Sequence, residues 1–271
     1  MKKHVLTKFI CAAIVAAVGV GSAVAFGGCN AGDAHVEYAL SDDGTYYIVS
    51  GVSGDREGLT SYEVPATYSA EEGGQALPVK EIGKEAFFRC TSLRNITIPD
   101  TVEIIGELAF AQCRMSSFTI PDSVREIRRG AFGMCEVLTE ITIPDSVTVL
   151  ERQAFYCCTS LEKAVVNAPI TDLPAQAFYN SIVQHGGNIY TDTALETVYL
   201  PATLQKIDAS ALYGNFLNDI YFAGTKEQWR AIAFYEIVTE DGETVEKSVE
   251  RNRVLNSGVK ITCSDGIYQD E

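Results

Sequence analysis

The chain has 271 residues, 46% of them hydrophobic and 21% charged, so it is long enough to enclose a continuous apolar core. Its formal net charge is −15, but three basic residues and none of the acidic ones fall in residues 1–28. The remainder therefore has 18 basic against 36 acidic residues, a formal charge of −18. Such a charge repels nucleic acid and anionic lipid, which excludes both as expected partners and suits basic or cation-bridged ones.

The first 28 residues have the pattern of an export signal peptide. Three lysines precede an apolar run at 9–20, which small residues follow and which is too short to span a bilayer. Two alternative processing sites fit the sequence. Ala23-Val24-Ala25 suits cleavage before Phe26, whereas residues 26–29 resemble a bacterial lipobox in which Cys29 is lipidated, although Phe26 replaces the usual Leu. Either site predicts a mature chain that works outside the cytoplasm. The lipobox alternative adds a lipid at Cys29, which would be the chain's one contact with the membrane.

Residues 29–60 are predicted to form a linker and an N-terminal cap. Two segments that alternate in polarity, 36–40 and 45–49, flank the pair Asp43-Gly44. This arrangement is typical of a β-hairpin with an Asp-Gly turn.

Residues 61–223 repeat one phrase, approximately I-x-I-P-x-x-V-x-x-I-x-x-x-A-F-x-x-C-x-x-L. Successive copies begin 22 or 23 residues apart, except at two gaps of 34 that contain Gly-rich insertions near 70–75 and 184–192. A fixed period in this range predicts a solenoid, in which each unit buries its apolar face by stacking on its neighbours. The copies begin at residues 62, 96, 118, 141, 164, 198 and 220.

Each unit is expected to form one coil that begins with a short strand. The two isoleucines of I-x-I point inward, the residue between them points outward, and the following Pro ends the strand. Val102 and Ile105, and their equivalents, are expected to re-enter the core on an irregular stretch. The Ala109-Phe110 pair and its equivalents are placed on a short helical turn on the convex side. Stacking would line up the strands as a parallel β-sheet on the concave face.

Four cysteines occupy the same place in successive coils, three residues after the A-F pair: Cys90, Cys113, Cys135 and Cys158. Cysteines in an exported chain usually indicate disulfides. Their recurrence in register with Leu and Ile favours instead a buried structural thiol ladder. No His or acidic residue recurs beside them, so no metal site is expected. Cys157 and Cys263 are left unassigned.

Residues 224–271 are predicted to form a small α/β cap and a tail. Thr225 and Gln228 make a capping box that opens a short helix containing Trp229. The charged segment 239–253 is expected to be an exposed loop or loose hairpin, and residues 259–262 a final strand.

The repeat resembles the BspA-like leucine-rich repeat proteins, which are surface proteins of bacteria and some protists. The likeness rests on Ile-Thr-Ile-Pro-Asp-Ser-Val at 141–147, on Ala-Phe-x-x-Cys-x-x-Leu at 86–93, 131–138 and 154–161, and on capping phrases such as 220–229. It extends over nearly all of residues 36–234 and implies a leucine-rich repeat solenoid, often attached to the cell surface. Some members mediate adhesion to host matrix proteins, other bacteria or host receptors, but the family shares architecture more securely than ligand. The chain departs from the pattern at 164–167 and after Phe178.

The outward residues of the predicted strands are candidates for ligand binding. This row changes from Thr to Tyr toward the C-terminus, and the second insertion, with His185 and Tyr190, comes just before the strand of Tyr199. Tyrosines offer stiff, amphipathic contact area for protein or sugar ligands, although strand propensity alone would also select Thr and Tyr. The candidate ligand-binding residues are Thr97, Thr119, Thr142, His185, Tyr190, Tyr199 and Tyr221.

The sequence has no recognisable catalytic pattern. It contains no G-x-S-x-G, H-E-x-x-H, Gly-rich phosphate loop or calcium loop, and no recurring inward pair of carboxylates. We therefore expect no catalytic residues and no cofactor. Two non-enzymatic classes remain. One is a cell-surface adhesion protein for an extracellular protein or glycan. The other is a structural or accessory envelope lipoprotein that scaffolds another envelope component.

Overall fold

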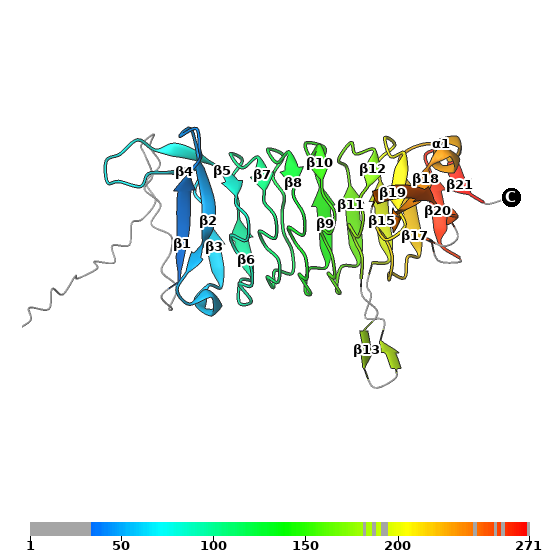
Figure 1. Cartoon of the computed structure of the whole chain (residues 1–271), viewed down its shortest axis with the longest axis horizontal. Helices are drawn as coiled ribbons and strands as arrows, with labels where there is room; N and C mark the ends of the chain where they lie inside the picture. Colours follow the sequence, from blue (N-terminus) through cyan, green and yellow to red (C-terminus); the bar gives the residue numbers. More distant parts are fainter. Residues whose placement is uncertain are drawn as a thin grey trace, which may run out of the picture.

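The computed structural model describes residues 34–180, 183–185, 188–190, 195–240, 243–251, 254–255 and 258–269. Figure 1 shows an elongated body in which the coils follow one another along the long axis, from the N-terminal strands to the C-terminal strands. The strands are mostly parallel and the helices few. The predicted signal segment 1–28 and Cys29 lie outside the described residues.

The first strand of each later coil belongs to one sheet, whose outward side we call the strand face. Its order is β21-β20-β17-β15-β11-β9, parallel except for β21. In β9 the side chains of Ile141 and Ile143 are buried and those of Glu140 and Thr142 are exposed, the alternation predicted for I-x-I. The strands are β9 (Glu140–Ile143), β11 (Lys163–Val166), β15 (Thr197–Leu200), β17 (Asp219–Phe222), β20 (Lys260–Cys263) and β21 (Gly266–Tyr268).

The strand face is interrupted at residues 118–120, where the prediction of a strand was wrong. On the N-terminal side of this break, β3 (Ser61–Glu63) and β6 (Asn95–Thr97) form a separate parallel pair. Phe118 stands where the other coils carry Ile, Val, Ala or Tyr. Its buried ring lies 5.1 Å from the Phe110 ring and 5.0 Å from the Phe132 ring, centroid to centroid. The Phe118 ring fills the space between the two coils, and the backbone at 118–120 forms no strand.

A second ladder of short parallel strands runs along the coils, where the sequence predicted only an irregular stretch. The amide of Arg128 donates to the carbonyl of Ile105 over 2.9 Å, and that of Glu151 to Ile127 over 2.9 Å. Strands of two residues show no alternation that a sequence pattern could reveal. The ladder consists of two sheets, which are not paired with each other. The first contains β5 (Leu77–Ile82), β7 (Ile104–Ile105), β8 (Glu126–Ile127) and β10 (Val149–Leu150), and the second contains β12 (Asp172–Leu173), β16 (Lys206–Asp208) and β18 (Ala233–Glu240).

The A-F pair lies on a turn, so the prediction of a short helical turn was wrong. The residue before each Ala has a positive φ, for example 54° at Leu108 and 64° at Gln153, which no α-helix contains. Phe110 N–H donates to the carbonyl of Ala131 in the next coil over 2.8 Å, and the other coils repeat this bond. The turn is therefore a third hydrogen-bonded ladder between coils. The described residues contain one α-helix, α1 (Lys226–Ala231), and one 3-10 helix, η1 (Arg56–Gly58).

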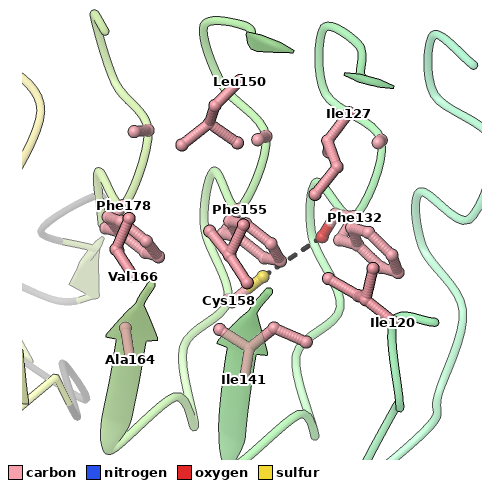
Figure 2. Packing of buried hydrophobic residues seen from close by; sticks show 14 of the residues in the cluster. Ile120, Ile127, Phe132, Ile141, Leu150, Phe155, Cys158, Ala164, Val166 and Phe178 are labelled. Atoms are coloured by element: carbon pink, nitrogen blue, oxygen red, sulfur yellow. Dashed lines mark hydrogen bonds between the residues drawn. The ribbon is translucent and has the colours of Figure 1, made fainter. Parts of the chain in front are cut away.

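The core is built around a column of phenylalanines, one from each turn. Neighbouring rings have centroids 5.2 to 5.4 Å apart, and three of the four pairs are within 7° of parallel. The Phe110–Phe132 pair, beside Phe118, is tilted by 22°. Figure 2 shows the column enclosed between the strand face and the second ladder. The rings belong to Phe87, Phe110, Phe132, Phe155 and Phe178.

The repeated cysteines are buried beside this column, and no disulfide joins them. The thiol of Cys158 donates to the carbonyl of Phe132 over 3.1 Å, as drawn in Figure 2, and Cys113 and Cys135 repeat this bond to the coil before them. At the equivalent position Asn215 donates from its amide to the carbonyl of Phe178 over 2.7 Å. Burial raises the pKa of Cys90 to about 11, so this thiol is protonated at neutral pH.

The N-terminal unit is a hairpin attached to the second ladder. Strands β1 (His35–Leu40) and β2 (Tyr47–Ser53) are antiparallel, and β2 pairs in parallel with β5. The loop between them is longer than the predicted two-residue turn. In it the Asp43 carboxylate accepts from the Ser41 hydroxyl at 2.7 Å and from the Thr45 hydroxyl at 2.8 Å. The short β4 (Thr67–Tyr68) pairs antiparallel with β5 across the first insertion.

The C-terminal unit combines α1, the antiparallel pair β18–β19 (Glu243–Ser248) and the strands β20 and β21. Both hydrogen bonds of the predicted capping box at Thr225 and Gln228 are present. Arg251 fastens the tail, because its guanidinium donates to the Tyr268 hydroxyl at 2.9 Å and lies 5.6 Å from the centre of the buried Trp229 ring. The charged segment 239–253 was expected to be an exposed loop or loose hairpin. It includes the end of β18 and all of β19, which pair with each other as an antiparallel hairpin.

Candidate binding surface on the strand face

One row of outward side chains crosses five consecutive strands of the strand face. The register aligns each of its residues with the next across parallel strands from β9 to β20. The candidates Thr142, Tyr199 and Tyr221 thus fall in a single row, as their position in the repeat predicts. The complete row is Thr142, Val165, Tyr199, Tyr221 and Thr262.

Tyr199 and Tyr221 form a stacked pair in this row. Their ring centroids are 4.6 Å apart and the planes differ by 11°, with both side chains half-buried. The ammonium of Lys163 lies 5.7 Å from the centre of the Tyr199 ring, a cation–π contact from the neighbouring strand. The stack holds both rings in fixed orientations on an open sheet surface, so little side-chain freedom remains to be lost when a ligand binds.

A groove of about 580 Å³ lies beside this row, at the break in the strand face. Thr119 and Thr142, from adjacent coils, both line it, so the structure brings these two candidates together. The groove exists because residues 117–120 leave the sheet next to β9. Its other lining residues include Phe118, Pro144 and Asn167.

Three carboxylates give the groove a negative character: Asp122, Glu140 and Asp145 line it as well. Among the described residues none of the three takes part in an ion pair, whereas Arg128 and Arg129 pair with other acids. An arrangement of unneutralised carboxylates attracts cationic groups of a ligand.

The remaining candidates lie elsewhere. Thr97 is on β6 and aligns with Glu63 of β3, on the other side of the break. His185 and Tyr190 belong to β13 (Val183–His185) and β14 (Asn188–Tyr190), an antiparallel pair separate from the other sheets, and their side chains lie outside the described ones. The structure therefore groups Thr119 with Thr142 and Tyr199 with Tyr221, and leaves Thr97 apart.

Sequence reasoning missed the last member of the row and the acidic groove. Thr262 completes the row because β20 pairs with β17 in register, although Lys260-Ile-Thr-Cys263 lacks the Pro that marks earlier copies. The alternation of Ile261 and Cys263 around Thr262 was the available signal. Nothing in the sequence indicated a groove, since it depends on the absence of a strand at 118–120.

Neither a metal centre nor a membrane span is found within the part of the chain that the structure describes. No three side chains of the His, Cys, Asp or Glu type gather there in a way that could hold a metal ion. No helix within that part is long and apolar enough to cross a bilayer.

Comparison with known proteins gives one family match. The model of the BspA type leucine rich repeat region matches residues 76–185 and 180–240, in six copies. Among curated proteins, none matches the chain.

Several solved structures are similar to parts of the chain. A leucine-rich repeat protein from Bacteroides capillosus is 30% identical over 48% of this chain and 91% of its own, with a TM-score of 0.41. The leucine rich repeat protein of T. pallidum is 20% identical over 69% of this chain and 82% of its own, with a TM-score of 0.40. The pneumococcal vaccine antigen PcpA is 18% identical over 71% of this chain and 42% of its own, with a TM-score of 0.51 that indicates a shared fold.

Proposed function

The chain belongs to the BspA-type leucine-rich repeat proteins, and from this premise we propose that it is a non-enzymatic binding protein of the bacterial cell surface. The observation that carries the proposal is the stacked Tyr199–Tyr221 pair, held half-exposed in a regular row on the strand face. Aromatic side chains that are already ordered lose little entropy on binding and supply much of the contact energy at interfaces.

The ligand of this surface is an extracellular protein or glycan that presents basic groups. Asp122, Glu140 and Asp145 in the groove support this choice, together with the formal charge of −18 on residues 29–271. Basic groups would meet the carboxylates while an apolar or sugar ring contacts the tyrosines. Association should then slow and weaken as ionic strength rises.

We also propose that the protein is exported and that its two terminal units cap the ends of the solenoid. The lysines and apolar run of residues 1–28 support export, and Gly27-Gly28-Cys29 supports lipid attachment at Cys29. The hairpin β1–β2 and the C-terminal unit would act as caps that cover the apolar faces and strand edges of the terminal coils. Mass spectrometry of the protein purified from its own membranes would reveal the lipid on an N-terminal Cys29. A mature chain that begins at Phe26 would contradict lipid attachment.

Binding should be measured with the purified mature chain, residues 30–271, against matrix proteins, host receptors and glycans at physiological salt. The Tyr199→Ala/Tyr221→Ala double variant should lose saturable binding. Tyr46→Ala, in the loop before β2 at the other end of the molecule, serves as the matched control. Removing the stack should cost only about 1 kcal/mol of folding stability, so the melting temperature should change little. Unchanged affinity in the double variant would refute the proposed site.

If the folded chain binds none of these ligands, the partner should be sought within the envelope. Crosslinking in the native cell would then identify the envelope component that a structural or accessory lipoprotein would scaffold. That outcome would replace adhesion as the function.

A further inference from the structure

A second aromatic array lies on the turns, away from the row on the strand face. Tyr156, Tyr179 and Tyr213 each directly follow the second residue of the A-F position in three successive coils. The rings of Tyr156 and Tyr179 stack with centroids 5.2 Å apart and planes within 5°, and those of Tyr179 and Tyr213 at 5.6 Å and 16°. We call these three residues the tyrosine ladder.

The ladder is open to solvent at its C-terminal end. Tyr213 is 48% exposed, and Phe216, three residues later, is 52% exposed, so both offer ring surface to a ligand. Tyr156 and Tyr179 are half-buried. A hydrogen bond with Cys157 raises the pKa of Tyr156 to about 12, so its hydroxyl is neutral and retains its proton.

The turns that bear the ladder differ from the earlier turns in their content of charged residues. The three turn segments 153–161, 174–180 and 209–218 contain no Asp, Glu, Lys, Arg or His. The equivalent segments of the earlier coils do contain charged residues: Glu85 and Arg89 in one coil, Arg114 in the next and Glu136 in the third. A chain with a net charge of −18 over residues 29–271 thus has three successive turns free of charge, and these are the turns that bear the tyrosines.

The polar groups beside the ladder are amides and hydroxyls, which both donate and accept hydrogen bonds. Gln153 and Gln176 come from adjacent coils, and the amide of Gln153 donates to the carbonyl oxygen of Gln176 over 2.8 Å. A neutral ligand offers no opposite charge to offset the desolvation of a charged group, so neutral amides and hydroxyls suit such a ligand.

These observations point to one class of ligand, and we propose that the tyrosine ladder binds a neutral polysaccharide. Equivalent groups recur coil after coil along a line, which suits a linear polymer of repeating units. Neutral amides and hydroxyls match sugar hydroxyls, and the exposed rings of Tyr213 and Phe216 contact the apolar faces of the sugars. The site is separate from the strand face and does not depend on its function.

The test is native gel electrophoresis of the mature chain through gels that contain a soluble neutral polysaccharide, namely dextran, a soluble β-glucan or galactomannan. Wild type should be retarded by at least one of the three. Tyr213→Ala/Phe216→Ala should raise the dissociation constant about tenfold or more, the loss expected when exposed aromatic anchors are removed. Tyr199→Ala/Tyr221→Ala is the matched control and should bind the polymer like wild type.

The melting temperature separates loss of the site from loss of the fold, because both substituted residues are exposed and the variant should melt with wild type. Tyr179→Phe removes one hydroxyl and keeps the stack, and should weaken binding less than the double variant. The proposal is overturned if none of the three polymers retards wild type, or if the Tyr213→Ala/Phe216→Ala variant is retarded equally. It is also overturned if the strand-face variant loses polymer binding instead.

Discussion

The phenylalanine column should make stability depend on how many ring neighbours each Phe has. Phe155 is 1% exposed and stacks on two rings, Phe132 at 5.2 Å and Phe178 at 5.3 Å. Phe155→Ala should therefore fall at the upper end of the range for such substitutions, destabilising the fold by about 4–5 kcal/mol. For a domain of this size that loss lowers the melting temperature by roughly 8–20 °C.

Phe178 provides the matched control. It is also 1% exposed, but the next coil has Leu212 at the equivalent position, so Phe178 stacks only on Phe155. Phe178→Ala should destabilise by about 1 kcal/mol less than Phe155→Ala, the value of one aromatic stack. Equal losses, or a loss below about 2 kcal/mol for Phe155→Ala, would refute the ring-by-ring reasoning.

The assay is urea unfolding followed by far-UV circular dichroism, which reports all coils, and by fluorescence of the single Trp229 in the C-terminal unit. Coincident transitions would show that one free energy describes the whole chain. If the two probes separate, the coils unfold in part independently and each transition must be fitted alone.

Three further outcomes follow from the contacts described above. Cys135→Ala should lower the free energy of unfolding, measured with urea, by about 1 kcal/mol, because it removes the thiol that donates to the Phe110 carbonyl. A stability equal to wild type would contradict a bonding role for the thiol. Arg251→Ala should cost about 2–4 kcal/mol, because the guanidinium contacts three aromatic rings and donates to the Tyr268 hydroxyl and to the carbonyls of Trp229 and Arg230. An unchanged melting temperature would contradict its role in holding the tail. Burial raises the pKa of Asp172 above its unfolded value, so the folded state binds its proton more tightly and stability falls as pH rises through that window. Asp172→Asn should reduce this slope in urea unfolding as the pH rises above the ordinary Asp pKa of about 4, and an unaltered slope would refute the assignment.

The strands of the strand face could be predicted because the I-x-I phrase repeats with a clear alternation. In β9, β11, β15 and β17 the inward residues are those the pattern indicates. The one failure, at 118–120, coincides with Phe118, whose ring packs between the rings of two neighbouring coils. A hydrophobic pattern treats Phe118 and Ile141 alike, whereas packing between Phe110 and Phe132 does not.

The turns and the second ladder could not be predicted from the sequence, for a different reason. Left-handed backbone is expected mainly at glycine, yet Gly130 is the one Gly that precedes an A-F pair, and Glu85, Leu108 and Gln153 adopt the same conformation. The tertiary hydrogen bonds between coils impose it. For the candidate site, pairing in register could be predicted from the repeat, but the groove and the tyrosine ladder depend on how neighbouring coils pack.

Hydrogen bonds link neighbouring coils at the strand, at the second ladder or at the turn, and in most places at more than one of these. Under tension the coils of the molecule should therefore separate one at a time. A pull on its two ends would detach a terminal coil first, while the inner coils keep both neighbours. Each ordinary coil that yields releases 22 or 23 residues, or roughly 75–80 Å of extended chain. Under a steady pull the chain would therefore lengthen in steps.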